Sequence, residues 1–304
     1  MVLRSLSPPG AFPLVASKKD IDEVIAVCRQ ATAANRSTAA RRGTLIHLAP
    51  ADADDVLVTA DLHGDRTNFR RVLSVADLEK NRRRHLVFQE VIHGGPTYPD
   101  AGGCMSHLLL EDVARLKTRF PERVHFLMGN HELAELTDYP VMKGGRMLNL
   151  LFRTGVQTLY GAAADDVREA YLGLIRSLPL GLKLADDVLI THSLPEGLDR
   201  RPLTKDIFSQ EPEDADFQEG GDVFRIVWGR DYREKNAERY CHLTGARFLI
   251  TGHEPCAAGY RSPNSRQLIL DTCSRKSCYA VIALANLPQT LEELLGCVRY
   301  LDQN

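Results

Sequence analysis

The sequence has none of the features that are typical of membrane proteins or nucleic-acid-binding proteins. Its 38 Lys and Arg are balanced by 40 Asp and Glu, for a formal net charge of -2, so it has no basic footprint for phosphates. No apolar run approaches the roughly 20 residues of a membrane helix. The opening stretch, MVLRSLSPPGAF, has no signal-peptide apolar core. We therefore expect a cytoplasmic protein with no nucleic acid and no membrane among its partners.

Cysteine is sparse, and its spacing suggests no paired function. The seven cysteines are an odd number and include no C-x-x-C pair, so neither a disulfide framework nor a thiolate zinc site is indicated. Hydrophobic side chains make up 44% of the chain and charged ones 26%, which suffices for a full core. No linker or repeat divides the chain. We expect an N-terminal helical extension over residues 1–43 and one domain over 44–304.

Short apolar runs alternate with helical patterns after a first helix expected at 18–35, where Val24 and Cys28 lie at helical spacing. Strands are expected at 44–49, 55–60, 85–92, 123–128, 187–191, 247–251, 267–271 and 279–285, and further helices at roughly 66–80, 105–118 and 164–177. Continuous apolar strands alternating with helices predict an α/β fold whose sheet is covered on both faces. The acidic segment 209–222 is expected to be a mobile surface loop.

Polar side chains of metal-ligand and acid/base type lie near or just after the ends of five of these strands. They are Asp61 and His63, Glu90, Asn130 and His131, His192, and His253. In α/β sheets the carboxyl ends of strands form ligand sites, so side chains distant in sequence can converge there. A single histidine after a strand is more often an ordinary loop residue than a ligand. Five strand ends of this kind are improbable by coincidence, and we expect one shared site.

These side chains have the chemical hardness that suits two divalent metal ions. An Asp and a His would hold the first ion, a carboxylate would bridge, and an Asn oxygen with two His nitrogens would complete the second. Such a pair activates a water as hydroxide and neutralises phosphoryl oxygens during in-line attack. Thiolates would be the wrong ligands here, and the cysteines avoid these strand ends.

Four short motifs together resemble those of the calcineurin-like metallophosphoesterases. They are ADLHGD at 60–65, GNHE at 129–132, THS at 191–193 and GHE at 252–254. The phosphoprotein serine/threonine phosphatase branch is the most similar one, and the passage SLPLGLKLADDVLITHSLP and the segment RIVWGRD at 225–231 extend the resemblance to roughly residues 44–285. The resemblance implies a central β-sandwich flanked by helices. It also implies hydrolysis of phosphomonoesters with two divalent metal ions, manganese first and iron or zinc as alternatives.

The resemblance also implies a role for each matching position. Asp61 and His63 would bind one metal ion, and Asn130, His192 and His253 would bind the other. His131 would be the general acid that protonates the leaving-group oxygen. Glu132 is expected to hold the loop.

The second motif of the family, Gly-Asp-x-x-Asp-Arg-Gly, falls on QEVIHGG at 89–95 and departs from the pattern. The bridging aspartate becomes Glu90, which keeps the charge but adds a methylene. The aspartate that orients the catalytic histidine becomes His93, which could accept a hydrogen bond from His131 or serve as an extra metal ligand or phosphate donor. The phosphate-clamping arginine becomes Gly94, so one bidentate cationic contact is missing.

Other cations would then have to contact the phosphate. Arg230, two residues after Trp228, is the first candidate, and Arg275 with Lys276 in the loop DTCSRKSC is the second. Either could be only surface charge. The substrate partner expected on these grounds is a phosphorylated protein or a small phosphoester.

Three functions remain open from the sequence. The leading one is a metal-dependent phosphatase acting on phosphoprotein Ser/Thr or a related phosphomonoester. The second is a dinucleoside polyphosphate hydrolase, because that activity uses the same motifs. The third is a catalytically impaired metal-binding module with a regulatory role, suggested by the changes at Glu90, His93 and Gly94. Retention of every metal-ligand type and of His131 favours an active enzyme.

Overall fold

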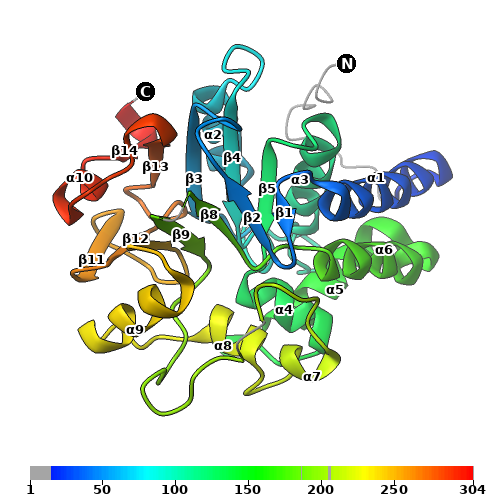
Figure 1. The fold of residues 1–304 in the computed structure, drawn as a ribbon. Helices are drawn as coiled ribbons and strands as arrows, with labels where there is room; N and C mark the ends of the chain where they lie inside the picture. The colour runs from blue at the N-terminus through cyan, green and yellow to red at the C-terminus, as the bar shows by residue number, and fades with distance from the viewer. Residues whose placement is uncertain (1–14, 186, 205–206, 304) are drawn as a thin grey trace.

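Two β-sheets pack face to face at the centre of the molecule, and helices cover their outer faces (Figure 1). The structure, a computed structural model, describes residues 15–185, 187–204 and 207–303. Hydrophobic side chains from both sheets interdigitate in one buried cluster that includes Val56, Val58, Leu182 and Ile190. The expected β-sandwich flanked by helices is confirmed.

The smaller sheet has five strands, with β3, β4 and β5 parallel to one another. In spatial order they are β14 (Val298–Tyr300), β13 (Cys278–Ala283), β3 (Asp55–Asp61), β4 (Arg84–Gln89) and β5 (Val124–Leu127). Val56 and Val58 of β3 face the other sheet, while Leu57 packs toward the helices. Burial on both faces explains why these strands are apolar without alternation.

The larger sheet has seven strands, in which β9 and β10 are parallel neighbours. In spatial order they are β1 (Arg41–Arg42), β2 (Leu45–Leu48), β8 (Gly181–Leu184), β9 (Val188–Thr191), β10 (Phe248–Thr251), β12 (Gln267–Leu270) and β11 (Tyr260–Asn264). A separate hairpin pairs β6 (Met142–Lys143) with β7 (Arg146–Met147). The carboxyl ends of β9 and β10 therefore lie side by side.

The helices surround the sandwich. They are α1 (Lys18–Ser37), α2 (Arg66–Ala76), α3 (His107–Arg119), α4 (Asn130–Thr137), α5 (Leu148–Tyr160), α6 (Ala164–Arg176), α7 (Asp214–Phe217), α8 (Asp222–Trp228), α9 (Glu234–Thr244) and α10 (Leu291–Leu295). None of the helices in the described ranges is both long and apolar enough to cross a bilayer.

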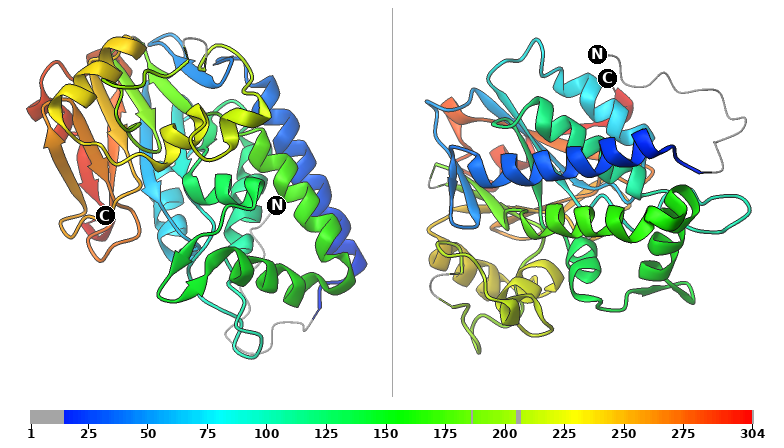
Figure 2. Two further views of the ribbon diagram at one scale, coloured as in Figure 1. Left: turned by 90° about the horizontal axis from the view of Figure 1, so that it is seen from below. Right: turned by 90° about the vertical axis from the view of Figure 1, so that its right-hand side faces the viewer.

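Helix α1 lies alongside α6 and also packs on α3 (Figure 2). It begins with a capping box, in which the side chain of Ser17 accepts from the Asp20 N–H and the Asp20 carboxylate accepts from the Ser17 N–H. Its buried residues Val24 and Cys28 belong to the same core cluster as the outer face of the five-stranded sheet. Residues 1–14 of the expected extension lie outside the described residues, and a boundary at residue 43 remains a prediction.

Two expected elements end three or four residues early, and one expected loop contains a helix. The strand expected at 85–92 stops at Gln89, because Glu90 adopts a left-handed backbone with φ 40°. The helix expected at 66–80 stops at Ala76, where Asp77 turns left-handed. The acidic segment 209–222 contains the short helix α7, whose Phe217 is buried, so its description as a loop was wrong in that part.

Candidate metal centre and active site

The polar side chains singled out in the sequence meet where the carboxyl ends of strands from both sheets lie together. Asp61 is the last residue of β3, Glu90 directly follows β4, and Asn130 begins the helix α4 that follows β5. His192 directly follows β9, and His253 follows β10 by two residues. Parallel pairing within each sheet brings these ends together, and the packing of one sheet on the other closes the cluster.

Left-handed backbone is concentrated at this cluster. Seven non-glycine residues of the described ranges have positive φ, and four of them are His63, Glu90, His93 and His253, at 43°, 40°, 58° and 71°. Each such residue costs on the order of 1–3 kcal/mol and persists only where its surroundings hold it. The Glu90 carbonyl is held by the N–H groups of Leu62 and His63, at 2.8 and 3.1 Å. The backbone therefore presents these side chains in fixed directions.

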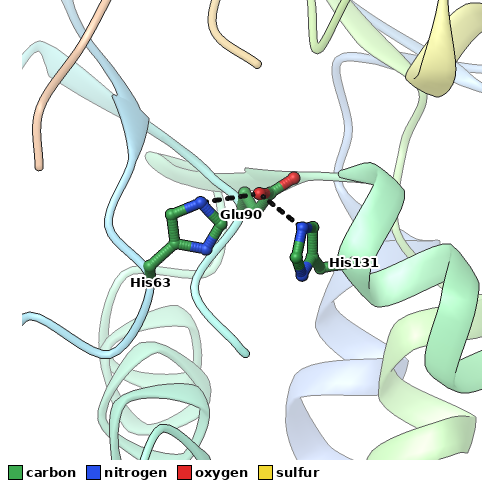
Figure 3. A group of neighbouring side chains, drawn as sticks. All are labelled: His63, Glu90 and His131. Atoms are coloured by element: carbon green, nitrogen blue, oxygen red, sulfur yellow. Dashed lines mark ion pairs between the residues drawn. The ribbon is translucent and has the colours of Figure 1, made fainter. Parts of the chain in front are cut away.

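The carboxylate of Glu90 lies between two sets of histidines. Its Oε1 is 3.0 Å from His63 Nε2 and 3.5 Å from His131 Nε2, as Figure 3 shows. Its Oε2 is 2.8 Å from His192 Nε2. One carboxylate thus contributes an oxygen to each of two compact ligand groups, His63–Glu90–His131 and Glu90–His192–His253.

The second group has the geometry of a closed cation site. Asn130 Oδ1 lies 2.8 Å from both His192 Nε2 and His253 Nδ1, and those two nitrogens are 3.2 Å apart. Glu90 Oε2 is buried and has no hydrogen-bond partner among the described residues, although it lies close to His192. A buried carboxylate oxygen beside a converging amide oxygen and two imidazole nitrogens fits a metal ion, which would satisfy all four atoms.

Asp61 lies beside both groups. Its Oδ2 is 3.9 Å from His63 Nε2, its other oxygen, Oδ1, is 3.9 Å from His192 Nδ1, and Oδ1 accepts the His253 N–H at 3.0 Å. The more compact group around His63 contains His131 instead of Asp61. The expected assignment of Asp61 as a ligand and His131 as the general acid therefore remains a prediction.

His93 contacts two side chains at once, and the sequence had not indicated this pair of contacts. Its Nδ1 lies 3.0 Å from His131 Nδ1, and its Nε2 lies 3.2 Å from Glu135 Oε1. His93 and Glu135 are both fully buried, with side chains 0% and 1% exposed. Glu135 was missed from the sequence, although it stands four residues after His131 on α4, where i and i+4 share a helix face.

Glu132 holds the loop that follows β4, as expected from the sequence. Its Oε1 accepts the backbone N–H groups of Val91 and Ile92, at 2.9 and 3.1 Å. Gln89, which was not singled out, is fully buried and accepts through Oε1 from His192 Nδ1 at 3.4 Å. That contact leaves His192 Nε2 free to face the cluster, an arrangement common for metal-binding imidazoles.

Gly94 stands where the family has its phosphate-clamping arginine. A Cβ at this position would lie 2.8 Å from His63 O and 2.9 Å from His63 Cβ. Any side chain here would collide with the loop that carries His63. An arginine therefore cannot stand at position 94, because the loops that carry Gly94 and His63 approach each other too closely.

The family model of calcineurin-like phosphoesterases matches residues 55–257, more than half of the chain. The chain belongs to the calcineurin-like phosphoesterase family. The phosphoesterase resemblance seen in its motifs is therefore confirmed.

Individual relatives of this phosphoesterase are distant. A probable serine/threonine-protein phosphatase of Encephalitozoon cuniculi is 26% identical over 227 residues, which cover 68% of this chain and 44% of the relative. The chain therefore spans less than half the length of that relative. The relative supports the phosphatase resemblance.

Two solved structures share the fold. A Saccharomyces cerevisiae serine/threonine phosphatase with similarity to human phosphatase PP5 aligns with TM-score 0.61 at 16% identity, covering 92% of this chain and 88% of that one. A cold-active protein-tyrosine phosphatase of a psychrophilic Shewanella species aligns with TM-score 0.53 at 16% identity, covering 97% and 89%. At these identities the likeness establishes the fold alone.

Charge interactions within the site favour ionisation of the Glu90 carboxylate. Burial opposes ionisation of Glu90, but the imidazoles of His131, His63 and His192 outweigh it and hold the pKa of Glu90 well below its usual range. Burial likewise lowers the pKa of His63, but Glu90 and Asp61 outweigh it and raise that pKa to about 9. The side chains of the site, taken by themselves, therefore favour positively charged groups next to Glu90.

Two other groups are shifted in the opposite direction. Burial and the charge of Glu90 raise the pKa of Asp61 to about 6. Burial lowers the pKa of His131 to about 3, and the neighbouring rings of His63 and His93 add to this against the attraction of Glu90. The neutral imidazole of His131 is the form that these side chains favour.

The candidate phosphate-binding arginines lie outside the buried cluster. Arg230 Nε pairs with Glu254 Oε1 at 2.6 Å, and the Arg230 side chain is 49% exposed. Glu254 directly follows His253, which places Arg230 at the rim of the site. Arg275 and Lys276 are exposed in the loop between β12 and β13. Their expected contact with phosphate remains a prediction.

Trp228, the last residue of α8, forms part of the wall of the site. Its ring stacks on His131 with centroids 6.5 Å apart and meets His253 edge-on at 6.3 Å. Its buried Nε1 has no hydrogen-bond partner among the described residues. The segment RIVWGRD thus contributes an aromatic face beside the site as well as Arg230 at its rim.

Proposed function

We propose that this phosphoesterase is a dinuclear metal-dependent phosphatase that hydrolyses phosphomonoesters on proteins, with Ser/Thr phosphates as the leading substrate class. One observation carries the proposal: the two carboxylate oxygens of Glu90 reach two separate ligand groups, at 3.0 Å from His63 and 2.8 Å from His192. The similarity to the probable serine/threonine-protein phosphatase of Encephalitozoon cuniculi supports the substrate class.

The residues divide into two sets around this bridge. Asn130, His192 and His253, with Glu90 Oε2, would hold one ion, and His63 with Glu90 Oε1 would hold the other, with Asp61 nearby. Oxygen and imidazole ligands of this kind suit manganese, iron or zinc. When bound, two such ions would polarise the phosphoryl oxygens and supply hydroxide near neutral pH.

His131 would supply the proton that the leaving group needs. Its Nδ1 faces His93, so its Nε2 is the nitrogen directed toward Glu90 and the centre of the site. To act in this way His131 would have to be an imidazolium, with the negative charge of a bound phosphate raising its pKa from the value of about 3 that the side chains alone favour. As the P–O bond to the leaving group breaks, Nε2–H would donate its proton to the departing oxygen. General acids of this kind contribute about 10²- to 10⁴-fold to the rate.

The proposal is tested by the metal content of the purified protein together with turnover. Peptides bearing phosphoserine, phosphothreonine or phosphotyrosine and a dinucleoside tetraphosphate are offered with added manganese. We expect about two ions per chain and preferred hydrolysis of the phosphoserine and phosphothreonine peptides. The matched control is Asp138→Asn, which alters a polar surface side chain 70% exposed and should leave turnover unchanged.

The other outcomes identify the alternatives. Preferred cleavage of the dinucleoside tetraphosphate would replace the phosphatase with a nucleotide hydrolase, and preferred cleavage of phosphotyrosine would change the substrate class. Two bound ions with no turnover on any substrate would support the impaired regulatory module. A protein that binds no metal would refute the proposal.

A further inference from the structure

A buried carboxylate stands behind the catalytic histidine of this enzyme, separated from it by one imidazole ring. His131 Nδ1, His93 and Glu135 form a continuous chain with spacings of 3.0 and 3.2 Å. We infer that Glu135 is the positioning residue that orients His131, acting through His93, and this inference rests on the function proposed above. The aspartate that the family motif would place at position 93 is thereby replaced by a longer route to a different carboxylate.

Donor and acceptor roles along the chain follow from Glu135. An ionised carboxylate can only accept, so His93 Nε2 carries the hydrogen and donates it to Glu135 Oε1. His93 Nδ1 is then a lone pair and accepts from His131 Nδ1–H. His131 Nε2 is left for the proton that passes to the leaving group. The chain fixes the tautomer of both rings and the direction of the catalytic nitrogen.

The charge of Glu135 is supported from its other side. Its Oε2 faces Arg153 Nε at 3.4 Å and Arg168 Nε at 3.7 Å, while its Oε1 faces His93. Both arginines also pair with the exposed Asp138. Burying a carboxylate is costly unless it is paired, and Glu135 has two guanidinium groups beside one oxygen and the His93 ring beside the other.

The surrounding structure keeps the intermediate ring in place. His93 is fully buried, its backbone N–H donates to Ser106 Oγ at 3.0 Å, and its ring packs edge-on against Phe152. Glu135 lies one helical turn after His131 on α4, so both ends of the chain are set by one rigid element. These contacts give His93 a single orientation between two groups of fixed spacing.

The first experiment compares leaving groups. Glu135→Gln keeps the shape but removes the charge, and we expect kcat on a phosphoserine peptide to fall about 10- to 100-fold with KM unchanged. Turnover of 4-nitrophenyl phosphate should be nearly unchanged, because its acidic leaving group needs little protonation. Asp138→Asn removes the other partner of the same arginines and should alter neither rate. Equal losses on both substrates, or no loss on either, would overturn the inference.

The second experiment tests whether Glu135 acts through His93. His93→Asp should place a carboxylate directly beside His131, and Asp tolerates the left-handed backbone at this position. In that background, Glu135→Gln should cause no further loss on the phosphoserine peptide. The same loss in both backgrounds would show that Glu135 acts independently of His93 and would refute the relay.

A third readout does not depend on turnover. In the zinc-loaded parent protein, ¹⁵N NMR of labelled histidines should show His93 protonated at Nε2 and His131 at Nδ1. The hydrogen-bonded ring proton of His93 should shift in Glu135→Gln and not in Asp138→Asn. A proton on His93 Nδ1 would overturn the inference. A parent that shows this pattern but hydrolyses no phosphoester would refute the proposed function and leave the relay standing.

Discussion

Shortening Glu90 by one methylene is the most direct test of how the site is built. In Glu90→Asp the carboxylate retracts by about 1.5 Å along the side chain. It can then no longer lie within 3.0 Å of His63 Nε2 and 2.8 Å of His192 Nε2 at once. The backbone cannot move to compensate, because the Glu90 carbonyl is bound by two N–H groups, one of them that of Leu62, and the following residue, Val91, is tied to Glu132.

The expected magnitude follows from that displacement. A misplacement of about 1 Å at a catalytic centre costs on the order of 10²-fold in rate. We therefore expect Glu90→Asp to lower kcat at least about 100-fold and to reduce metal content below that of the parent. Metal content would be measured by mass spectrometry of the purified protein, and turnover on a phosphothreonine peptide with added manganese.

Glu90→Gln is the matched control for length. It keeps every atom position but removes the negative charge that the bridge requires, so it should lose metal while keeping the fold. Glu90→Asp with full metal content and faster turnover would show that the extra methylene is a handicap, and parental turnover would show that it is not needed. Either result would refute the argument that the pocket is built around the longer side chain.

Three further predictions concern single histidines. His131→Asn should lower kcat about 10²- to 10⁴-fold with metal content unchanged. Loss of metal in this variant would show that His131 is a ligand, a role that its position beside His63 and Glu90 would allow. His192→Ala should release metal, measured as ions per chain, because His192 Nε2 contacts Glu90 and Asn130; unchanged content would contradict its ligand role. Burial lowers the pKa of His85 from 6.5 to about 4, so only the unfolded chain binds this proton as pH falls through that window. Stability should therefore decrease by up to about 3 kcal/mol on acidification, and urea denaturation should show a shallower pH dependence in His85→Phe.

The sheets could be predicted well because of how they are buried. Strands β3, β4 and β5 are covered by the second sheet on one face and by helices on the other, so their sequences are continuously apolar. The ends of strands and helices were less predictable. Glu90 and Asp77 end β4 and α2 by adopting a left-handed backbone, which could not be predicted from their residue types. The short helix α7 was missed because its burial depends on the single side chain of Phe217.

The candidate site was predicted as a set of residues but not as a set of contacts. Strand-end position brought out Glu90, His192 and the other polar side chains, since parallel pairing turns a repeated sequence position into a spatial cluster. Glu135 could not be recognised in this way, because its partner His93 comes from another loop. Its i+4 spacing from His131 was a signal, but many helical glutamates have such a spacing without any role.

The departures from the family motif depend on one another structurally. The length of Glu90 matches the gap between two ligand groups, and the adjacent Gln89 orients His192 toward the same carboxylate. Three residues after Glu90, His93 contacts the buried carboxylate of Glu135, a contact that an aspartate at position 93 would not need. Gly94 allows its loop to approach His63 closely. Of Gln89, Glu90 and His93, only Glu90 keeps a buried side-chain oxygen without a hydrogen-bond partner among the described residues, and that oxygen faces the ligand group of His192. A loop in which each altered residue has found a matching contact therefore favours a retained reaction over a decayed one.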